Sequence, residues 1–282
     1  FLTPSGLIID KVFSIFSPLT LFNGWFIIAR MSVDTLNQDV KSQIDNLLID
    51  TKKSSLDIAK TNTEIKNLLL IDIAKNINES RTSILLNNEK DLNLLDPKNF
   101  SPAFYDRLKL NDERIDQMIQ NINEVIDLED PVRKNRFLYE RPNGLKVFKQ
   151  SIPLGVICII YESRPNVTSD AASLCLKSGN SVLLRGGSEC FNTNKILVDI
   201  IQKSLIKNNI NKDSVNLVPY TDREVMKYIL RKDDDVDLVI PRGGEGLIRF
   251  VSENSSIPVI KHYKGVCHVY LDSEADLKIA HD

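Results

Sequence analysis

The sequence lacks a basic excess and any polybasic run. Its 282 residues include 36 Lys and Arg against 38 Asp and Glu, for a formal net charge of −2 at pH 7. A protein that binds nucleic acid or an anionic membrane surface generally carries clustered positive charge. We therefore expect neither partner and favour a small molecule. The hydrophobic content of 42% and the charged content of 26% are ordinary for a globular protein.

Cysteine is scarce, dispersed and free of CxxC pairs, so neither a disulfide framework nor a zinc site of four convergent ligands is expected. Free thiols in a reducing compartment, the cytoplasm, are the simpler interpretation. Cys267 is a weak candidate nucleophile, because Lys261, His262 and Lys264 lie nearby and positive neighbours lower a thiol pKa. Residues 266–271 have the pattern of a strand, however, which favours a buried structural thiol. The cysteines are Cys158, Cys175, Cys190 and Cys267.

Long uninterrupted hydrophobic runs are also absent. Residues 12–28 are apolar and aromatic, but Pro18 and Gly24 interrupt them, whereas a membrane-spanning helix needs about 20 apolar residues. Residues 1–30 also lack the initiating Met and the basic segment of a signal peptide. We expect residues 1–30 to be a disordered or non-native leader and Met31 to be the true start, with a weakly ordered hydrophobic leader as the alternative.

Glycine and proline are missing from Met31 to Asp96, and apolar residues recur at helical spacing there and again over residues 101–128. These segments predict packed helices, with Asn111 or Asp112 as a cap. Two short apolar segments, 137–140 and 145–149, then flank Pro142-Asn143-Gly144. This pattern predicts a hairpin over about residues 135–150, because Asn-Gly tolerates the positive φ of a tight turn. Such a hairpin packs on its own domain or pairs with another chain.

From Gly155 onward, short apolar segments alternate with helical ones. Fully apolar strands separated by amphipathic helices imply a parallel sheet that is covered on both faces. The fold class is therefore α/β, a doubly wound Rossmann-like sheet. The predicted strands are 156–161, 181–184, 215–218, 237–240 and 258–260, and the predicted helices are 167–177, 192–206, 222–230 and 245–253.

Three of the predicted strands end in residues suited to an anionic ligand, and ligands of such sheets bind beyond the carboxyl ends of the strands. The first strand is followed by Ser163, Arg164 and Asn166, where arginine supplies a planar cation and asparagine an amide donor. Asn166 could instead merely cap the next helix.

Two Arg-Gly-Gly loops follow the second and fourth strands. Glycines let a ligand approach the backbone closely, and the second loop directly precedes a helix, whose N-terminal amides attract anions. Either loop alone could be a turn, but together at one sheet edge they predict nucleotide binding. The residues concerned are Arg185, Gly186, Gly187, Ser188, Arg242, Gly243 and Gly244.

At these same residues the sequence resembles the glutamyl-phosphate reductases of the aldehyde dehydrogenase superfamily. The likeness runs from about Met31 to Asp282 and does not cover residues 1–30. It implies a nucleotide-binding domain, a catalytic domain, an oligomerisation hairpin near residues 135–150, and a homo-oligomer. The segments that carry it are Tyr161-Glu-Ser-Arg-Pro-Asn-Val-Thr168, Cys175-Leu-Lys-Ser-Gly-Asn180, Leu184-Arg-Gly-Gly187, Val239-Ile-Pro-Arg-Gly-Gly244, Pro258-Val-Ile-Lys-His262 and Cys267-His-Val-Tyr270.

The resemblance implies the NADPH-dependent reduction of L-glutamyl 5-phosphate to L-glutamate 5-semialdehyde and phosphate, the second step of proline biosynthesis. It makes Asn166 an oxyanion candidate and Ser163 and Arg164 substrate-binding candidates. Arg185 replaces a lysine that usually meets the adenosine ribose, and Ser188 stands where NAD-preferring relatives often place a glutamate. A neutral residue beside an arginine favours the 2′-phosphate of NADPH, although the neighbouring Glu189 opposes it.

In the family, the nucleophilic cysteine is expected in a segment shortly after the position of Asp282. We therefore expect residues 31–260 to form the nucleotide-binding domain and 261–282 to begin a truncated catalytic domain, without turnover by this chain alone. One alternative is a non-catalytic nucleotide-binding or assembly module. Another is a different acyl-phosphate or aldehyde dehydrogenase of the superfamily, against which the segment Glu-Ser-Arg-Pro-Asn-Val speaks.

Overall fold

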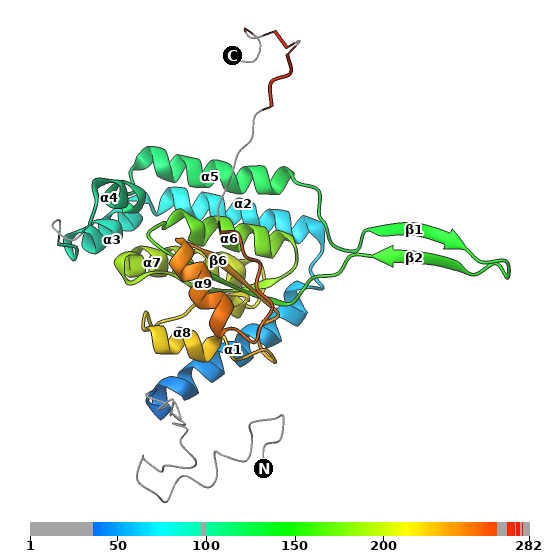
Figure 1. The fold of residues 1–282 in the computed structure, drawn as a ribbon, viewed down its shortest axis with the longest axis horizontal. Coiled ribbons are helices and arrows are strands. Elements are labelled where there is room, and N and C mark those ends of the chain that lie inside the picture. The colour runs from blue at the N-terminus through cyan, green and yellow to red at the C-terminus, as the bar shows by residue number, and fades with distance from the viewer. Residues whose placement is uncertain (1–35, 97–99, 264–269, 274, 277, 279–282) are drawn as a thin grey trace, which may run out of the picture. The chain divides into compact units, whose positions relative to one another are not determined.

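The computed structural model describes residues 36–278, apart from 97–99, 264–269, 274 and 277. Its centre is a four-stranded parallel sheet in the order β5-β4-β3-β6 (Figure 1). The predicted doubly wound α/β fold is therefore confirmed. No helix in the described ranges is both long and apolar enough to cross a membrane. The strands are β3 (Val156–Tyr161), β4 (Ser181–Arg185), β5 (Val215–Leu217) and β6 (Leu238–Arg242).

The central strand β3 is buried along its whole length, which explains why its sequence is continuously apolar rather than alternating. Successive side chains point to opposite faces of a sheet. One face of β3 joins a core with helices α2 (Thr63–Glu79), α5 (Asp112–Asp127), α6 and α7, and the other joins a core with α1 (Gln38–Ile58), α8 and α9. The helices that follow the strands are α6 (Asn166–Lys177), α7 (Phe191–Lys207), α8 (Arg223–Ile229) and α9 (Glu245–Asn254), with short 3₁₀ turns at Ser188–Cys190 and Lys212–Ser214.

The predicted helical region 35–95 divides into three helices, although it contains no Gly or Pro. The first helix ends at Ile58. Asn62 has extended backbone and caps the next helix, because its side chain accepts from the Ile65 amide at 2.9 Å. Asn111 caps α5 in the same way, as predicted, by accepting from the Arg114 amide. The five helices are α1 (Gln38–Ile58), α2 (Thr63–Glu79), α3 (Arg81–Asn93), α4 (Pro102–Leu108) and α5 (Asp112–Asp127).

The predicted fifth strand at 258–260 is wrong, because only a single bridge forms there, between Val239 and Val259. The Val239 amide donates to the Pro258 carbonyl and the Ile260 amide donates to the Val239 carbonyl. Pro258 itself has no amide hydrogen to donate. The segment therefore lies alongside β6 without extending the sheet as a regular strand.

The predicted hairpin is present as antiparallel strands β1 (Asn135–Glu140) and β2 (Lys146–Gln150). Its turn uses the conformational freedom of Gly144, which has φ of +83° and donates its amide to the Arg141 carbonyl at 2.8 Å. The hairpin extends away from the helices in Figure 1. Phe137 and Phe148 are each about half exposed, at 52% and 55%, although their rings meet edge to face. Apolar side chains are therefore displayed on a hairpin that has little support from its own domain.

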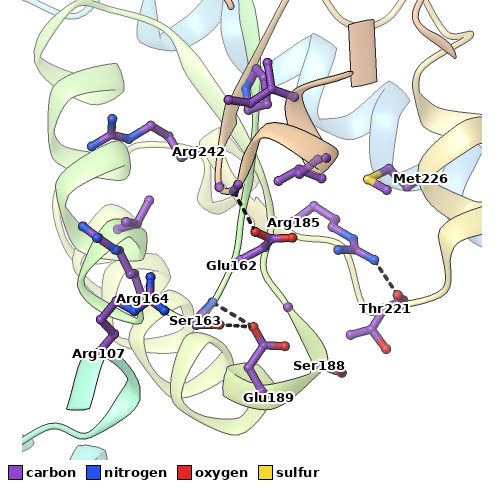
Figure 2. A pocket seen from close by; sticks show the side chains of 18 of the residues that line it. Arg107, Glu162, Ser163, Arg164, Arg185, Ser188, Glu189, Thr221, Met226 and Arg242 are labelled. Atoms are coloured by element: carbon purple, nitrogen blue, oxygen red, sulfur yellow. Dashed lines mark hydrogen bonds between the residues drawn. The ribbon is translucent and has the colours of Figure 1, made fainter. Parts of the chain in front are cut away.

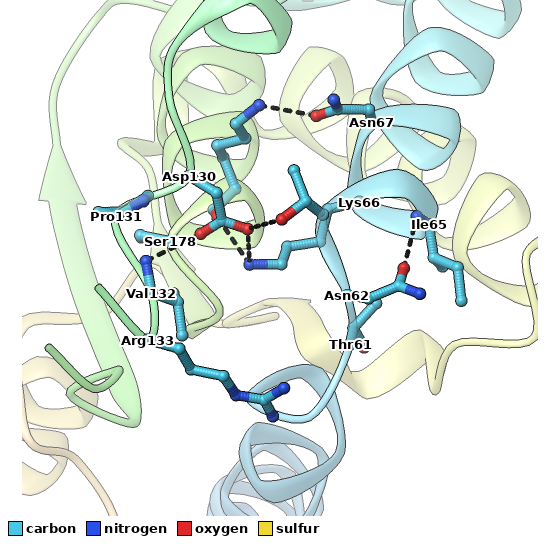
Figure 3. Close-up of polar contacts among 12 residues, drawn as sticks. Thr61, Asn62, Ile65, Lys66, Asn67, Asp130, Pro131, Val132, Arg133 and Ser178 are labelled. Atoms are coloured by element: carbon cyan, nitrogen blue, oxygen red, sulfur yellow. Dashed lines mark hydrogen bonds and ion pairs between the residues drawn. The ribbon is translucent and has the colours of Figure 1, made fainter. Parts of the chain in front are cut away.

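The root of this hairpin is held by a buried ion pair (Figure 3). The Lys66 ammonium is only 1% exposed and donates to Asp130 Oδ2 at 2.6 Å and to the Lys177 carbonyl at 3.1 Å. The same carboxylate accepts from the Thr63 hydroxyl and the Val132 amide. Because Asp130 precedes β1 while Lys66 lies on α2, the pair ties the chain that enters the hairpin to the helical layer.

Candidate functional site

A cavity of about 1360 Å³ opens at the carboxyl ends of β3, β4 and β6 (Figure 2). The chain winds outward from β3 through β4 to β5 and then returns to the other side of β3 as β6. The winding direction therefore reverses between β3 and β6. Open α/β sheets bind their ligands in the crevice at such a switch point.

At the end of β3, Ser163 has a φ of +45°, a left-handed conformation that is uncommon for a residue with a Cβ. Its amide and its hydroxyl both donate to the Glu189 carboxylate, each at 2.8 Å. These two bonds offset the backbone strain and connect the end of β3 to the loop after β4. Ser163 and its neighbour Arg164 both line the cavity, and Arg164 is exposed.

At the end of β4, Arg185 is 8% exposed and lines the cavity. Its Nη2 donates to the Thr221 carbonyl, whereas its Nε has no acceptor among the described residues. Burial lowers the pKa of this guanidinium, and the nearby carboxylates of Glu189 and Glu162 only partly oppose the effect. A buried donor without an acceptor is costly, and an anionic or hydroxyl-bearing ligand would relieve that cost.

The glycines after Arg185 serve packing as well as access. A Cβ at Gly186 would lie 2.1 Å from the Asn194 amide nitrogen, and one at Gly187 would lie 2.2 Å from a Glu189 carboxylate oxygen. Gly187 and Ser188 line the cavity, whereas Gly186 is not part of its lining.

At the end of β6, Arg242, Gly243 and Gly244 lead into α9 and all three line the cavity. Gly244 is the N-cap, and no side chain caps the helix. Its amide donates instead to Glu162 Oε2, at 3.1 Å. A Cβ at Gly243 would lie 2.4 Å from the same oxygen, so only glycine leaves room for the carboxylate there. The N-terminus of α9 therefore already faces a negative charge.

The cavity contains more positive than negative side chains. None of its arginines has an ion-pair partner within the described ranges, in contrast to Arg81, Arg114 and Arg249 elsewhere. Its carboxylates are already engaged by hydrogen bonds from protein groups, as Glu189 is by Ser163 and Asp91 by the Thr193 amide and hydroxyl. The balance favours an anionic ligand. The arginines are Arg107, Arg164, Arg185, Arg223 and Arg242, and the acidic residues are Asp91, Glu162 and Glu189.

Asn166, the predicted oxyanion donor, does not line the cavity. It lies in the first turn of α6, where its amide nitrogen donates to Asp170 Oδ2 at 3.0 Å. Asn121 donates to the other oxygen of the same carboxylate. The Asn166 side chain does not cap the helix either. Asn166 is therefore placed with Asp170 rather than in the cavity lining.

The three described cysteines are poor nucleophiles. Cys158, Cys175 and Cys190 are buried free thiols, and burial raises the pKa of each to about 12. A thiol with such a pKa carries almost no thiolate at neutral pH. Cys267 and the strand predicted around it lie outside the described residues, apart from Tyr270 and Leu271.

Several cavity residues escaped the sequence interpretation. Glu162 lies directly next to a predicted residue, and its position between a strand end and Ser163 was a usable signal. Arg223 follows the third strand, whose end carries no Arg-Gly-Gly motif. Arg107 comes from α4, far away in the sequence, and no motif marks it.

The chain is similar to known reductases. Gamma-glutamyl phosphate reductase of Desulfatibacillum aliphaticivorans is 49% identical over 237 residues, which are 83% of this chain and 57% of the relative. The crystal structure of gamma-glutamyl phosphate reductase from Thermotoga maritima has a TM-score of 0.79 at 39% identity, over 84% of this chain and 57% of its own. A probable aldehyde dehydrogenase from Listeria monocytogenes EGD-e shares the fold, with a TM-score of 0.62 at 14% identity over 79% of this chain and 46% of its own.

No family model matches the chain. The chain spans little more than half the length of the curated relatives it matches. Within that span, the identity and the shared fold agree with the residues that carry the resemblance. Over the span that they share, the chain is related in both sequence and fold to the gamma-glutamyl phosphate reductases.

Proposed function

We propose that the cavity binds NADPH and that the whole protein uses it to reduce L-glutamyl 5-phosphate to L-glutamate 5-semialdehyde and phosphate. The observation that carries the proposal is a cavity at the β3–β6 switch point with five arginines free of ion pairs within the described ranges, next to the N-terminus of a helix. The names of the relatives supply the substrate and the reaction.

The loop of Arg242, Gly243 and Gly244 is suited to a pyrophosphate. The first amides of α9 have no acceptor within the helix, and the helix dipole favours negative charge there. When bound, NADPH would supply the hydride. The role of these residues is to hold the charged middle of the cofactor in place.

Arg185, Ser188 and Arg223 are suited to a 2′-phosphate, which distinguishes NADPH from NADH. Ser188 brings no charge, and Arg185 has a buried Nε without an acceptor among the described residues. Glu189 is the residue that opposes this preference, and its carboxylate accepts two hydrogen bonds from Ser163. A carboxylate held in this way is less able to take a ribose hydroxyl, which supports NADPH as the cofactor.

The other wall of the cavity is suited to the acyl phosphate. Arg164 and Arg107 line it, and neither has an ion-pair partner in the described part of the chain (Figure 2). L-Glutamyl 5-phosphate carries a phosphate and a carboxylate, and guanidinium groups bind both. Chemistry of this class runs through a cysteine thiolate, which we expect from the length of the relatives that this chain does not span.

We also propose that the β1–β2 hairpin pairs with a second copy of the chain. Its exposed apolar side chains are Phe137, Leu138, Tyr139, Leu145 and Phe148. An isolated two-stranded hairpin is marginally stable in water, so a partner would supply the missing support.

A cytoplasmic location agrees with the three buried free thiols.

The proposal is tested by titrating the chain with NADPH and with NADH while following nicotinamide fluorescence. NADPH should bind at least about tenfold more tightly than NADH. Phosphate-dependent oxidation of glutamate 5-semialdehyde by NADP should be seen only with a protein of the relatives' full length. Failure of the chain to bind either nucleotide would contradict the cofactor assignment, and binding without turnover by the full-length protein would favour a nucleotide-binding module.

A further inference from the structure

Glu162 places a carboxylate where the cavity would receive a phosphate. It follows β3, yet its Oε2 accepts the Gly244 amide at the N-terminus of α9, 82 residues further along the chain (Figure 2). The oxygen also lies against the Cα of Gly243, since a Cβ there would approach it to 2.4 Å. Glu162 has no cation partner in the described ranges.

The contact uses the group that a phosphate would need. Helix N-termini bind anions through their amides, and there is room beside the Gly244 Cα, since a Cβ there would meet no other atom within 4 Å. α9 has ten residues and no side-chain cap, and the Glu162 carboxylate adds a negative charge at this end of the helix to that of Glu245 in its first turn.

A second observation shows that the Glu162 carboxylate does not supply an acceptor to every buried donor of the cavity. Arg185 is 92% buried and lines the same space, and its Nε remains without an acceptor among the described residues although Glu162 and Glu189 are near enough to influence it. The Nε of Arg185 is therefore available to a ligand anion even with Glu162 at the N-terminus of α9. A ligand that satisfies both Arg185 and the α9 amides must share the loop with Glu162 or displace it.

We propose that Glu162 is an internal competitor of the bound phosphate, a residue that sets how tightly the dinucleotide is held. Binding requires the carboxylate to leave the Gly244 amide, because two anions at one amide repel each other. The competition weakens binding and speeds release of the cofactor. This inference rests on the proposed function of the loop as a pyrophosphate site.

The test compares Glu162→Gln with Glu245→Gln in the full chain. Glu245 begins α9, pairs with Arg249 and does not line the cavity, so its change removes the same charge from the same helix end without freeing Gly244. NADPH binding is followed by fluorescence, and inorganic pyrophosphate is used as a competitor. Thermal melts establish that both variants are folded.

Glu162→Gln should bind NADPH and pyrophosphate about tenfold more tightly than the wild type, and Glu245→Gln should stay within about twofold. The gain should shrink as salt rises, because salt screens the repulsion. Equal or weaker binding by Glu162→Gln, or an equal gain in Glu245→Gln, would overturn the inference and leave the proposed function standing. Failure of every protein to bind would remove both.

Discussion

The structure uses buried positive charge in two opposite ways. At the root of the hairpin, Lys66 and Lys177 are both buried and both hydrogen-bonded, to Asp130, to Asn67 and to backbone carbonyls. At the sheet edge, Arg185 is buried to a similar degree but keeps a donor without an acceptor among the described residues. Removing the partner of a hydrogen-bonded buried charge lowers the stability of the fold strongly. A buried charge with an unpaired donor already lowers that stability. The first region therefore holds the fold, and the second is prepared for a ligand.

The pKa of the Asp130 carboxylate reflects its pairing with Lys66 at the hairpin root. Burial alone would raise the pKa of Asp130, but hydrogen bonds from Lys66, the Val132 amide and Thr63 outweigh it, and the pKa lies below its ordinary value. The folded state thus prefers the charged carboxylate. The pairing contributes stability whenever this carboxylate is ionised.

The largest expected effect is at the hairpin root. Asp130→Asn leaves the Lys66 ammonium, 1% exposed, without its anionic partner. We expect the free energy of unfolding to fall by about 3 kcal/mol, measured by chemical denaturation at pH 7. The control is Asp116→Asn, which breaks an exposed pair with Arg81 and should cost about 0.5 kcal/mol. Equal losses in the two variants would show that the buried pair at the hairpin root contributes no more stability than an exposed pair.

The same pair predicts a pH dependence. Because the folded-state pKa of Asp130 lies below the ordinary 3.8, its stabilisation is complete above that value and is lost as the pH falls through the lower, folded-state pKa. The difference in unfolding free energy between wild type and Asp130→Asn should therefore be constant from about pH 7 to about pH 5 and should shrink below the ordinary pKa. A difference that persists in strong acid would show that the loss comes from packing rather than charge.

At the sheet edge we expect the opposite combination of effects. Arg185→Met keeps much of the side-chain volume but removes the buried charge and its unsatisfied Nε. The free energy of unfolding should change by less than about 1 kcal/mol in either direction. The substitution removes the unfavourable burial of the charge, but it also removes the favourable hydrogen bond to the Thr221 carbonyl. NADPH affinity should fall by about tenfold or more. Arg231→Met, an exposed arginine outside the cavity, is the matched control for both measurements.

The smallest effect is expected at Asp170, a partly buried carboxylate. Burial raises the pKa of Asp170 despite hydrogen bonds from Asn121 and Asn166, so its ionised form costs stability above that pKa, and the cost disappears as the pH falls below the ordinary value. Asp170→Asn should therefore be neutral or stabilising at pH 7, by about 0.5 kcal/mol or less. It should also leave NADPH binding unchanged, since Asp170 lies outside the cavity lining. Destabilisation comparable to that of Asp130→Asn would contradict this expectation.

Much of the fold could be predicted because hydrophobic patterning is a local property of the chain. The four strands of the sheet occur where apolar runs predicted them, and the hairpin occurs around Gly144. The breaks at Asn62 and Ser80 were not predicted, because neither Gly nor Pro marks them. The break at Asn62 also depends on a side chain that bonds to the Ile65 amide. The segment at Pro258 failed as a strand because pairing needs donors as well as apolar side chains.

By itself the sequence determined which residues end the strands, and a parallel sheet brings all those ends to one edge. Its motifs therefore marked eight of the residues that line the cavity, and they pointed to the reductases that the chain is similar to. Only the tertiary structure decided how these residues are used: Arg107 enters from α4, Asn166 turns to Asp170, and Glu162 crosses to the amide of Gly244. The reason is that hydrogen bonds and charge pairing depend on distances through space, between elements that are far apart along the chain.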